Sequence, residues 1–228
     1  MILEQNLKKV LDKINIAKNK SNWGQRVDLI AATKTRDIST IEELYRLGVY
    51  AIGENRVQEA ESKFLDFPGF EKNKKRFIGH LQSNKVNKCL KLFDTIDSID
   101  TLKIAKKVNN ALKKNSDKKE CLIEINTSKE PQKHGFQPQI TDDLISCFKL
   151  SSLNVVGLMT VGPNTKNTST KQNAFVLLRK LKNQINNELG LQAIAELSMG
   201  MTSDYELAIQ EGSTMVRMGT GLFGARNY

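Results

Sequence analysis

Short apolar runs alternate with helical patterns along almost the whole chain, and this alternation constrains the fold more than any other feature of the sequence. The first run, 27–35, reads VDLIAATKT, and its residues 29–32 are apolar on both faces. A strand of that kind is buried on both sides, as the central strands of parallel sheets are. Comparable runs follow at 49–53, 76–79, 93–98, 121–126, 155–161, 193–199 and 214–220.

Eight strands that alternate with helices predict an α/β protein whose strands close into a single (β/α)8 TIM barrel. The 228 residues suit one domain over 1–228. A doubly wound open sheet is the alternative fold, but it would collect its polar loops at one crevice, whereas here polar loops follow strands around the whole array. The barrel is therefore the expected fold.

An additional helix is expected before the first strand. Apolar residues recur there at helical spacing: Leu3, Leu7, Val10, Leu11, Ile14 and Ala17. We expect this N-terminal helix to pack across one end or one side of the barrel. Within the barrel, the pattern predicts helices at about 40–47, 84–91 and 169–189.

Four polar residues are placed where a helix begins. We expect Ser39 and Ser203 to form capping boxes with Glu42 and Glu206, and Asp100 to cap the helix that follows 93–98. Asn55, with Gln58 three residues on, is either an N-cap or a polar contact at the barrel mouth, the rim where the carboxyl ends of the strands converge.

The composition narrows the classes of partner and compartment. The net charge of +10 comes mostly from scattered lysines, and no zinc finger, RNA-recognition signature or basic region with heptads accompanies it. No apolar run could span a bilayer or serve as a signal peptide. Three separated cysteines, without a CxxC pair, predict neither a disulfide framework nor a metal site. We expect a cytoplasmic protein with no nucleic-acid or membrane partner.

Lys34 ends the first strand, at the edge where a parallel barrel keeps its chemistry. Lysines flank many strands, so Lys34 either marks the point where the strand reaches the surface or attaches a carbonyl compound as an imine. His80, at the end of the third run, is likewise either a satisfied polar residue or a group for proton transfer. The loop 127–138 contains His134 and either closes over a ligand or is a solvated connection.

The last two strands are followed by residues suited to phosphate. Gly200 to Asp204 carries two hydroxyls at a helix start, where free backbone donors bind anions. Gly219 to Gly224 spells GxGxxG, but no βαβ unit can follow, so it is not a dinucleotide fingerprint. Its glycines instead allow backbone N–H groups to approach a phosphate. With Lys34 opposite this cradle, the mouth is predicted to bind a phosphorylated carbonyl compound, either pyridoxal phosphate (PLP) or a sugar phosphate.

Five segments resemble the pyridoxal phosphate homeostasis proteins, in order and over nearly the whole chain. They are AATKTR at 31–36, IGENRVQE at 52–59, FIGHLQSNK at 77–85, GLMTVGP at 157–163, and the C-terminal LSMGMTSDYELAIQEGSTMVRMGTGLFGARNY. The resemblance implies a fold type III PLP-binding barrel, similar to the amino domain of alanine racemase. It further implies that PLP is held as a Schiff base on Lys34.

The same resemblance assigns the remaining contacts of the cofactor. It implies phosphate contacts from Thr202, Gly219 and Thr220, a contact of Arg217 with the pyridine nitrogen, and Asn55 beside the cofactor. Thr202 stands where many members of the family have serine, and the hydroxyl is retained. No catalytic and no metal-binding residue is expected.

For function, the resemblance implies a carrier or regulator of intracellular vitamin B6 without established turnover. PLP and PLP-dependent apoenzymes are the expected partners, and a monomer is the expected state. The alternative is a PLP-dependent amino-acid racemase or an imine-forming aldolase. Racemases of this fold need a second acid or base from another domain, and this chain ends four residues after its last glycine. The carrier is therefore the preferred prediction.

Overall fold

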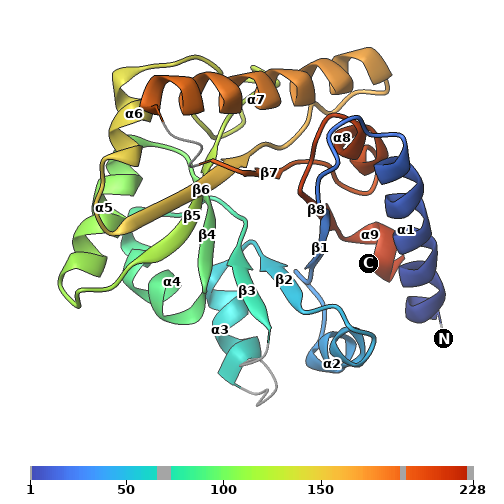
Figure 1. Ribbon diagram of the computed structural model, residues 1–228. Helices are drawn as coiled ribbons and strands as arrows, with labels where there is room; N and C mark the ends of the chain where they lie inside the picture. Colours follow the sequence, from blue (N-terminus) through green and yellow to red (C-terminus); the bar gives the residue numbers. More distant parts are fainter. Residues whose placement is uncertain (1, 66–72, 191–193, 225–228) are drawn as a thin grey trace.

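The computed structural model describes residues 2–65, 73–190 and 194–224, and its parallel strands close into a barrel in sequence order, β1 to β8 (Figure 1). The strands are β1 Asp28–Ala32, β2 Ala51–Glu54, β3 Lys74–Phe77, β4 Thr95–Ile99, β5 Lys119–Glu124, β6 Leu153–Met159, β7 Glu196–Ser198 and β8 Met215–Met218. Strand β8 returns to β1, with Ala31 opposite Met218. The barrel prediction is confirmed, and the open sheet is excluded.

Helices connect the strands and cover the outside of the barrel (Figure 1). They are α1 Ile2–Asn19, α2 Ile38–Arg46, α3 Val57–Leu65, α4 Val86–Leu92, α5 Leu102–Lys113, α6 Asp142–Phe148, α7 Thr168–Leu189, α8 Tyr205–Gln210 and α9 Thr220–Phe223, with a short 3-10 helix η2 at Ser83–Lys85. The N-terminal helix α1 packs against α8 and α9, so it covers a side of the barrel. None of the helices in these three described segments is long and apolar enough to cross a membrane.

Several strands end earlier than their apolar runs. Strand β5 stops at Glu124, and Ile125 instead forms an isolated bridge to Phe136. Strand β8 stops at Met218 because Gly219 leaves the extended conformation and Thr220 begins α9. Residue 193, where the predicted run 193–199 begins, lies outside the described segments. The strand in the rest of this run is β7. Apolar residues thus continue past the strands into the turns, where periodicity alone cannot locate the strand end.

The predicted cap of α2 is wrong by two residues. Asp37 is the N-cap, and its Oδ1 accepts from the backbone N–H of Thr40 at 2.9 Å. Ser39 lies inside the helix and donates its hydroxyl to Asp37. Hydrogen bonds from Thr40, with the one from its side chain contributing most, and from Ser39 lower the pKa of Asp37. Asp37, just upstream of Ser39, accepts hydrogen bonds at the start of α2 and so takes the place of the predicted capping box.

Two other cap predictions are also wrong. Thr101, not Asp100, caps α5 through its hydroxyl, which leaves the Asp100 carboxylate for contacts elsewhere. Helix α8 begins after Asp204 rather than at Ser203, and the Asp204 carboxylate accepts from the backbone N–H of Met201 at 2.7 Å. Each correction is a shift of one residue between neighbouring polar side chains. Local sequence ranks such neighbours almost equally.

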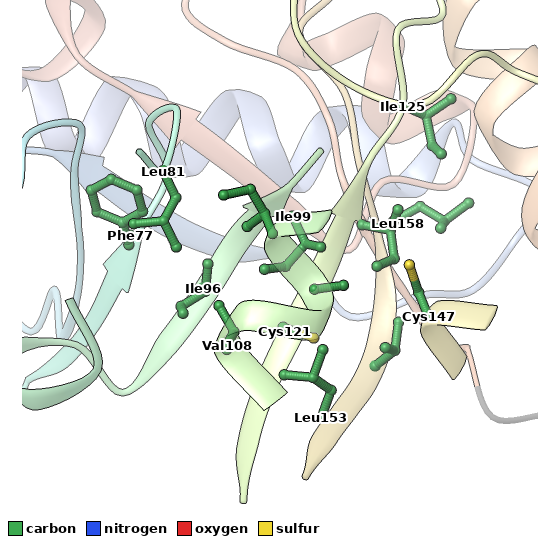
Figure 2. Packing of buried hydrophobic residues seen from close by; sticks show 14 of the residues in the cluster. Phe77, Leu81, Ile96, Ile99, Val108, Cys121, Ile125, Cys147, Leu153 and Leu158 are labelled. Atoms are coloured by element: carbon green, nitrogen blue, oxygen red, sulfur yellow. The ribbon is translucent and has the colours of Figure 1, made fainter. Parts of the chain in front are cut away.

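The largest apolar core lies between the strands and the helices that surround them. Phe77 of β3, Ile96 of β4 and Val108 of α5 belong to it, and Figure 2 shows them with their neighbours. Cys89 and Cys147 are buried in the same core, and burial raises the pKa of each thiol to about 12. Thiols of that kind stay protonated and act as small apolar side chains.

Candidate functional site

Lys34 is half-buried in a turn, residues 33–35, that directly follows β1 at the barrel mouth. We call this the lysine turn. Thr35 within it has φ +63°, a region that β-branched residues rarely adopt. Its backbone N–H donates to the Glu59 carboxylate of α3. Unfavourable backbone of this kind persists only where the surroundings impose it, and it gathers at functional sites.

A buried lysine, Lys63 of α3, holds the lysine turn in place through hydrogen bonds. Its Nζ lies 2.8 Å from the Thr33 carbonyl oxygen, from Oε1 of Glu54 and from Oε1 of Glu59. The Thr33 hydroxyl donates to Glu54 as well, at 2.7 Å. Burial raises the pKa of Glu54, and the contacts of Lys63 act against that rise. The end of β1, the end of β2 and α3 are thus joined by one buried ionic network.

The turn after β8, residues 219–221, contacts the loop that precedes α8. We call residues 219–221 the glycine turn. The backbone N–H of Gly221 donates to Thr202 Oγ1 at 3.0 Å, and a Cβ on Gly221 would lie 2.7 Å from Cε of Met218. A Cβ on Gly219 would meet only the Ala32 side chain of β1, at 4.0 Å. The two loops predicted to cradle phosphate therefore do come together, with open space at Gly219.

The lysine turn and the glycine turn are neighbours. Strands β1 and β8 are paired, and the guanidinium of Arg36 stacks over the ring of Phe223 in α9 at 4.9 Å. The sequence led us to expect Lys34 opposite the phosphate cradle. The two lie side by side instead, because closure of the barrel makes the first and last strands adjacent.

Arg217 of β8 is buried and reaches across to β6 and β7. Its Nη1 donates to the carbonyl oxygen and the hydroxyl of Ser198 at 2.8 and 2.7 Å, and Nη2 donates to the carbonyl oxygen of Thr160 at 2.7 Å. Burial lowers the pKa of Arg217, and carboxylates, Asp97 first, act against this change. A guanidinium has five N–H donors, so these three bonds leave donors for a ligand.

Comparison with known proteins places this arrangement in a family. Residues 6–227 match the family model described as alanine racemase, N-terminal domain. A pyridoxal phosphate homeostasis protein of Haemophilus influenzae is 40% identical over 231 residues, which cover 100% of this chain and 98% of that protein. Its namesake from Aquifex aeolicus is 35% identical and covers 98% of both chains. The chain belongs to the pyridoxal phosphate homeostasis protein family.

Solved structures share the barrel. PipY of Synechococcus elongatus, solved with PLP bound, superposes with a TM-score of 0.83 at 29% identity, covering 97% of this chain and 100% of that one. Alanine racemase of Clostridium difficile superposes with a TM-score of 0.75 at 17% identity, covering 98% of this chain and 58% of that one. The second likeness is one of fold.

Asn55 lies in the turn after β2, two residues before α3, and so is not at the N-cap position. Gly79, just after β3, explains how its backbone is placed. A Cβ on Gly79 would lie 2.1 Å from the Asn55 carbonyl oxygen. Only glycine allows the turns after β2 and β3 to touch in this way. Asn55 therefore lies at the barrel mouth, and its polar contact with a ligand there stays a prediction.

Two histidines that the sequence left undecided meet at the mouth. His80 Nδ1 lies 2.7 Å from Oδ2 of Asp100, and His134 Nδ1 lies 3.8 Å from the same oxygen. The two rings stack with centroids 3.7 Å apart and planes 11° apart. A metal ion binds imidazole in the plane of the ring, and one ion cannot lie in both of these stacked planes. His80 is hydrogen-bonded to Asp100, and His134 stacks on His80, so the loop after β5 packs against the ends of β3 and β4.

Glu124, the last residue of β5, is a buried carboxylate that the sequence analysis missed. It interrupts an apolar run, and nothing in its neighbours signals a role. Burial, reinforced by Asp100, raises the pKa of Glu124 to about 7, while Arg217 and His80 act against the rise. The barrel mouth thus contains a carboxyl group that titrates near neutral pH.

This raised pKa predicts a stability change in Glu124→Gln. The folded protein holds the proton more tightly than the unfolded chain, so Glu124 lowers stability increasingly as pH rises from about 4.5 to about 7. At pH 8 we expect Glu124→Gln to unfold at a higher urea concentration than the parent, with a free energy of unfolding that is larger by up to about 3 kcal/mol. At pH 5 this difference should be smaller. Glu120→Gln, on the same strand but solvent-exposed, serves as control. Equal gains at both pH values would contradict the raised pKa.

Proposed function

We propose that this protein binds PLP in the barrel mouth, attached to Lys34, and serves intracellular homeostasis of the cofactor as a carrier without catalytic turnover. The observation that carries the proposal is the adjacency of the lysine turn and the glycine turn on the paired strands β1 and β8. Relatives named as PLP homeostasis proteins and the PLP-bound structure of PipY support it.

The residues of the mouth fit this cofactor. PLP, when bound, supplies an aldehyde that forms an imine with a primary amine. The Lys34 amine is offered by a turn that the Lys63 network holds in place. Thr202, Gly219 and Thr220 would hold the phosphate, since the hydroxyls of the two threonines and the open space at Gly219 meet there.

The Arg217 side chain suits a protein that binds the cofactor without activating its ring for carbanion chemistry. A guanidinium donates hydrogen bonds and cannot accept a proton, so a pyridine nitrogen that faces Arg217 stays unprotonated. An unprotonated ring is a weak sink for electrons, which limits carbanion chemistry and leaves imine exchange available. Asn55 would stand beside the ring, at the end of β2.

The alternatives are an amino-acid racemase and an imine-forming aldolase, and the names of the relatives favour neither. The deciding experiment is borohydride reduction of the purified protein followed by peptide mass spectrometry. We expect a yellow protein that bleaches and carries the added pyridoxyl mass on the peptide of Lys34. A colourless protein trapped only together with a sugar phosphate would support the aldolase, and racemisation of an added amino acid would support the racemase.

The proposal extends to the setting of the protein. We infer one PLP-binding domain over 1–228, a monomer, PLP-dependent apoenzymes as recipients of the cofactor, and no nucleic-acid partner. We also infer the cytoplasm as its compartment. The three buried free cysteines fit that reducing compartment, since none of them depends on oxidation.

The phosphate contact is tested by Thr220→Val, which removes one hydroxyl and keeps the shape of the side chain. A hydrogen bond to a charged group contributes about 1.5–3 kcal/mol, so we expect PLP to be released on the order of 10-fold faster or more. The imine should still form, since Lys34 is untouched. Release is measured by transfer of PLP to an excess of a trapping amine. Release at the parent's rate would place the phosphate elsewhere.

A further inference from the structure

A cavity of about 540 Å³ opens where the turns after β2 and β3 meet, next to the mouth. Its polar lining consists of Asn55, Arg56, Gln58, His80, Gln82 and Lys85. No carboxylate among the described residues lines it. Cavities of this size accommodate small organic molecules, so there is room for more than a bare ion.

The cationic side chains of this cavity have no close carboxylate partner among the described residues, although Glu59 lies near enough to Arg56 to interact with it electrostatically. Neither Arg56 nor Lys85 forms an ion pair within the described segments, although both line the same space. A cavity at the opposite end of the barrel shows the contrast. It is also lined by lysine and arginine, but Lys74 there pairs with Glu120 at 2.9 Å and Arg26 with Asp28 at 2.7 Å. The cavity beside the mouth therefore favours negative charge, and the one at the far end does not.

Neutral donors complete the lining. The amides of Asn55, Gln58 and Gln82 offer N–H groups. His80 donates from Nδ1 to Asp100, so the neutral ring presents Nε2 as an acceptor and supplies no donor to an anion. Close contact between the Gly79 and Asn55 backbones fixes the two turns that bring these groups together. Two cations and several amides around one space are the groups that carboxylate and phosphate oxygens bind.

We propose that this cavity binds a small organic anion, through a carboxylate or phosphate group, beside the cofactor site. Asn55 borders both spaces, so the anion would lie next to the PLP that we place in the mouth. The anion site itself rests on its own lining residues and not on the attachment of PLP to Lys34.

The test is an NMR titration of the side-chain amides of Asn55, Gln58 and Gln82 with inorganic phosphate and, separately, with acetate. Each titration is done before and after addition of PLP, because phosphate alone would also enter the glycine turn. We expect amide shifts that saturate and that persist in the PLP-loaded protein. Imine absorbance is recorded in the same samples, so failure of PLP attachment is seen separately from failure of the anion site.

The variants are chosen to remove charge without removing packing. The double substitution Arg56→Gln and Lys85→Gln should weaken the anion by about 10-fold or more. Lys91→Gln, the same change at an exposed lysine of α4 that lies outside the cavity, should leave the affinity unaltered. Saturation by phosphate alone or by acetate alone supports the site and identifies the preferred group. Shifts that saturate with neither anion, or a double variant with the parent's affinity, would overturn the proposal.

Discussion

Replacing Lys34 by alanine will abolish the imine absorbance of the PLP-loaded protein and leave measurable affinity for PLP. In the proposed binding mode the Lys34 amine is one anchor of the cofactor, and the glycine turn with Thr202 is another. Each hydrogen bond to the charged phosphate contributes about 1.5–3 kcal/mol, so several of them retain micromolar binding after the ordering costs are subtracted. The absorbance change is complete, because no imine forms without the amine.

Absorbance and calorimetric titration together measure this result. Lys91→Ala, which removes an exposed lysine of α4, is the control and should keep both the absorbance and the affinity. Retention of the imine in Lys34→Ala would mean that another lysine carries the cofactor. If Lys34→Ala bound PLP no more tightly than an unrelated protein of similar charge, the phosphate would not lie at the glycine turn.

The parts of this site that the sequence predicted are those fixed by strand ends. Lys34, Arg217 and Gly219 belong to β1 and β8 or directly follow them, and the alternation of strands with helices determines which edge of the barrel they share. What the sequence did not determine was the order around that edge. Closure pairs β1 with β8 and so brings the lysine turn and the glycine turn side by side, although they lie almost two hundred residues apart in the chain.

Other site residues were hidden because tertiary packing decides their burial. Glu59 and Lys63 stand four residues apart, the spacing of an ordinary pair on a solvated helix face. Only the position of α3 against the ends of β1 and β2 turns Lys63 inward onto Glu54. Likewise His80 and Asp100 meet because β3 and β4 are parallel neighbours, and nothing local to either residue announces it.

Lys63→Met is expected to be the most destabilising of the changes considered for this site. The substitution removes a cation that bonds to Thr33, Glu54 and Glu59, and it keeps the length of the side chain. Glu54 is fully buried, and its Oε2 already has no hydrogen-bond partner among the residues that the structure describes. Removing one partner of a buried ion pair leaves an uncompensated charge, at a cost of about 3–5 kcal/mol.

Urea unfolding measures this loss, with Lys74→Met as the matched control. Lys74 also pairs with a glutamate, at 2.9 Å, but both side chains are nearly half exposed, so we expect a loss below about 1 kcal/mol. Adding Glu54→Gln to Lys63→Met should recover part of the loss, since the stranded charge is then absent. The lysine turn should also loosen, because Thr33 and, through Glu59, Thr35 lose their anchor, and imine formation with PLP should slow. A Lys63→Met protein as stable as Lys74→Met would show that the network does not hold the turn.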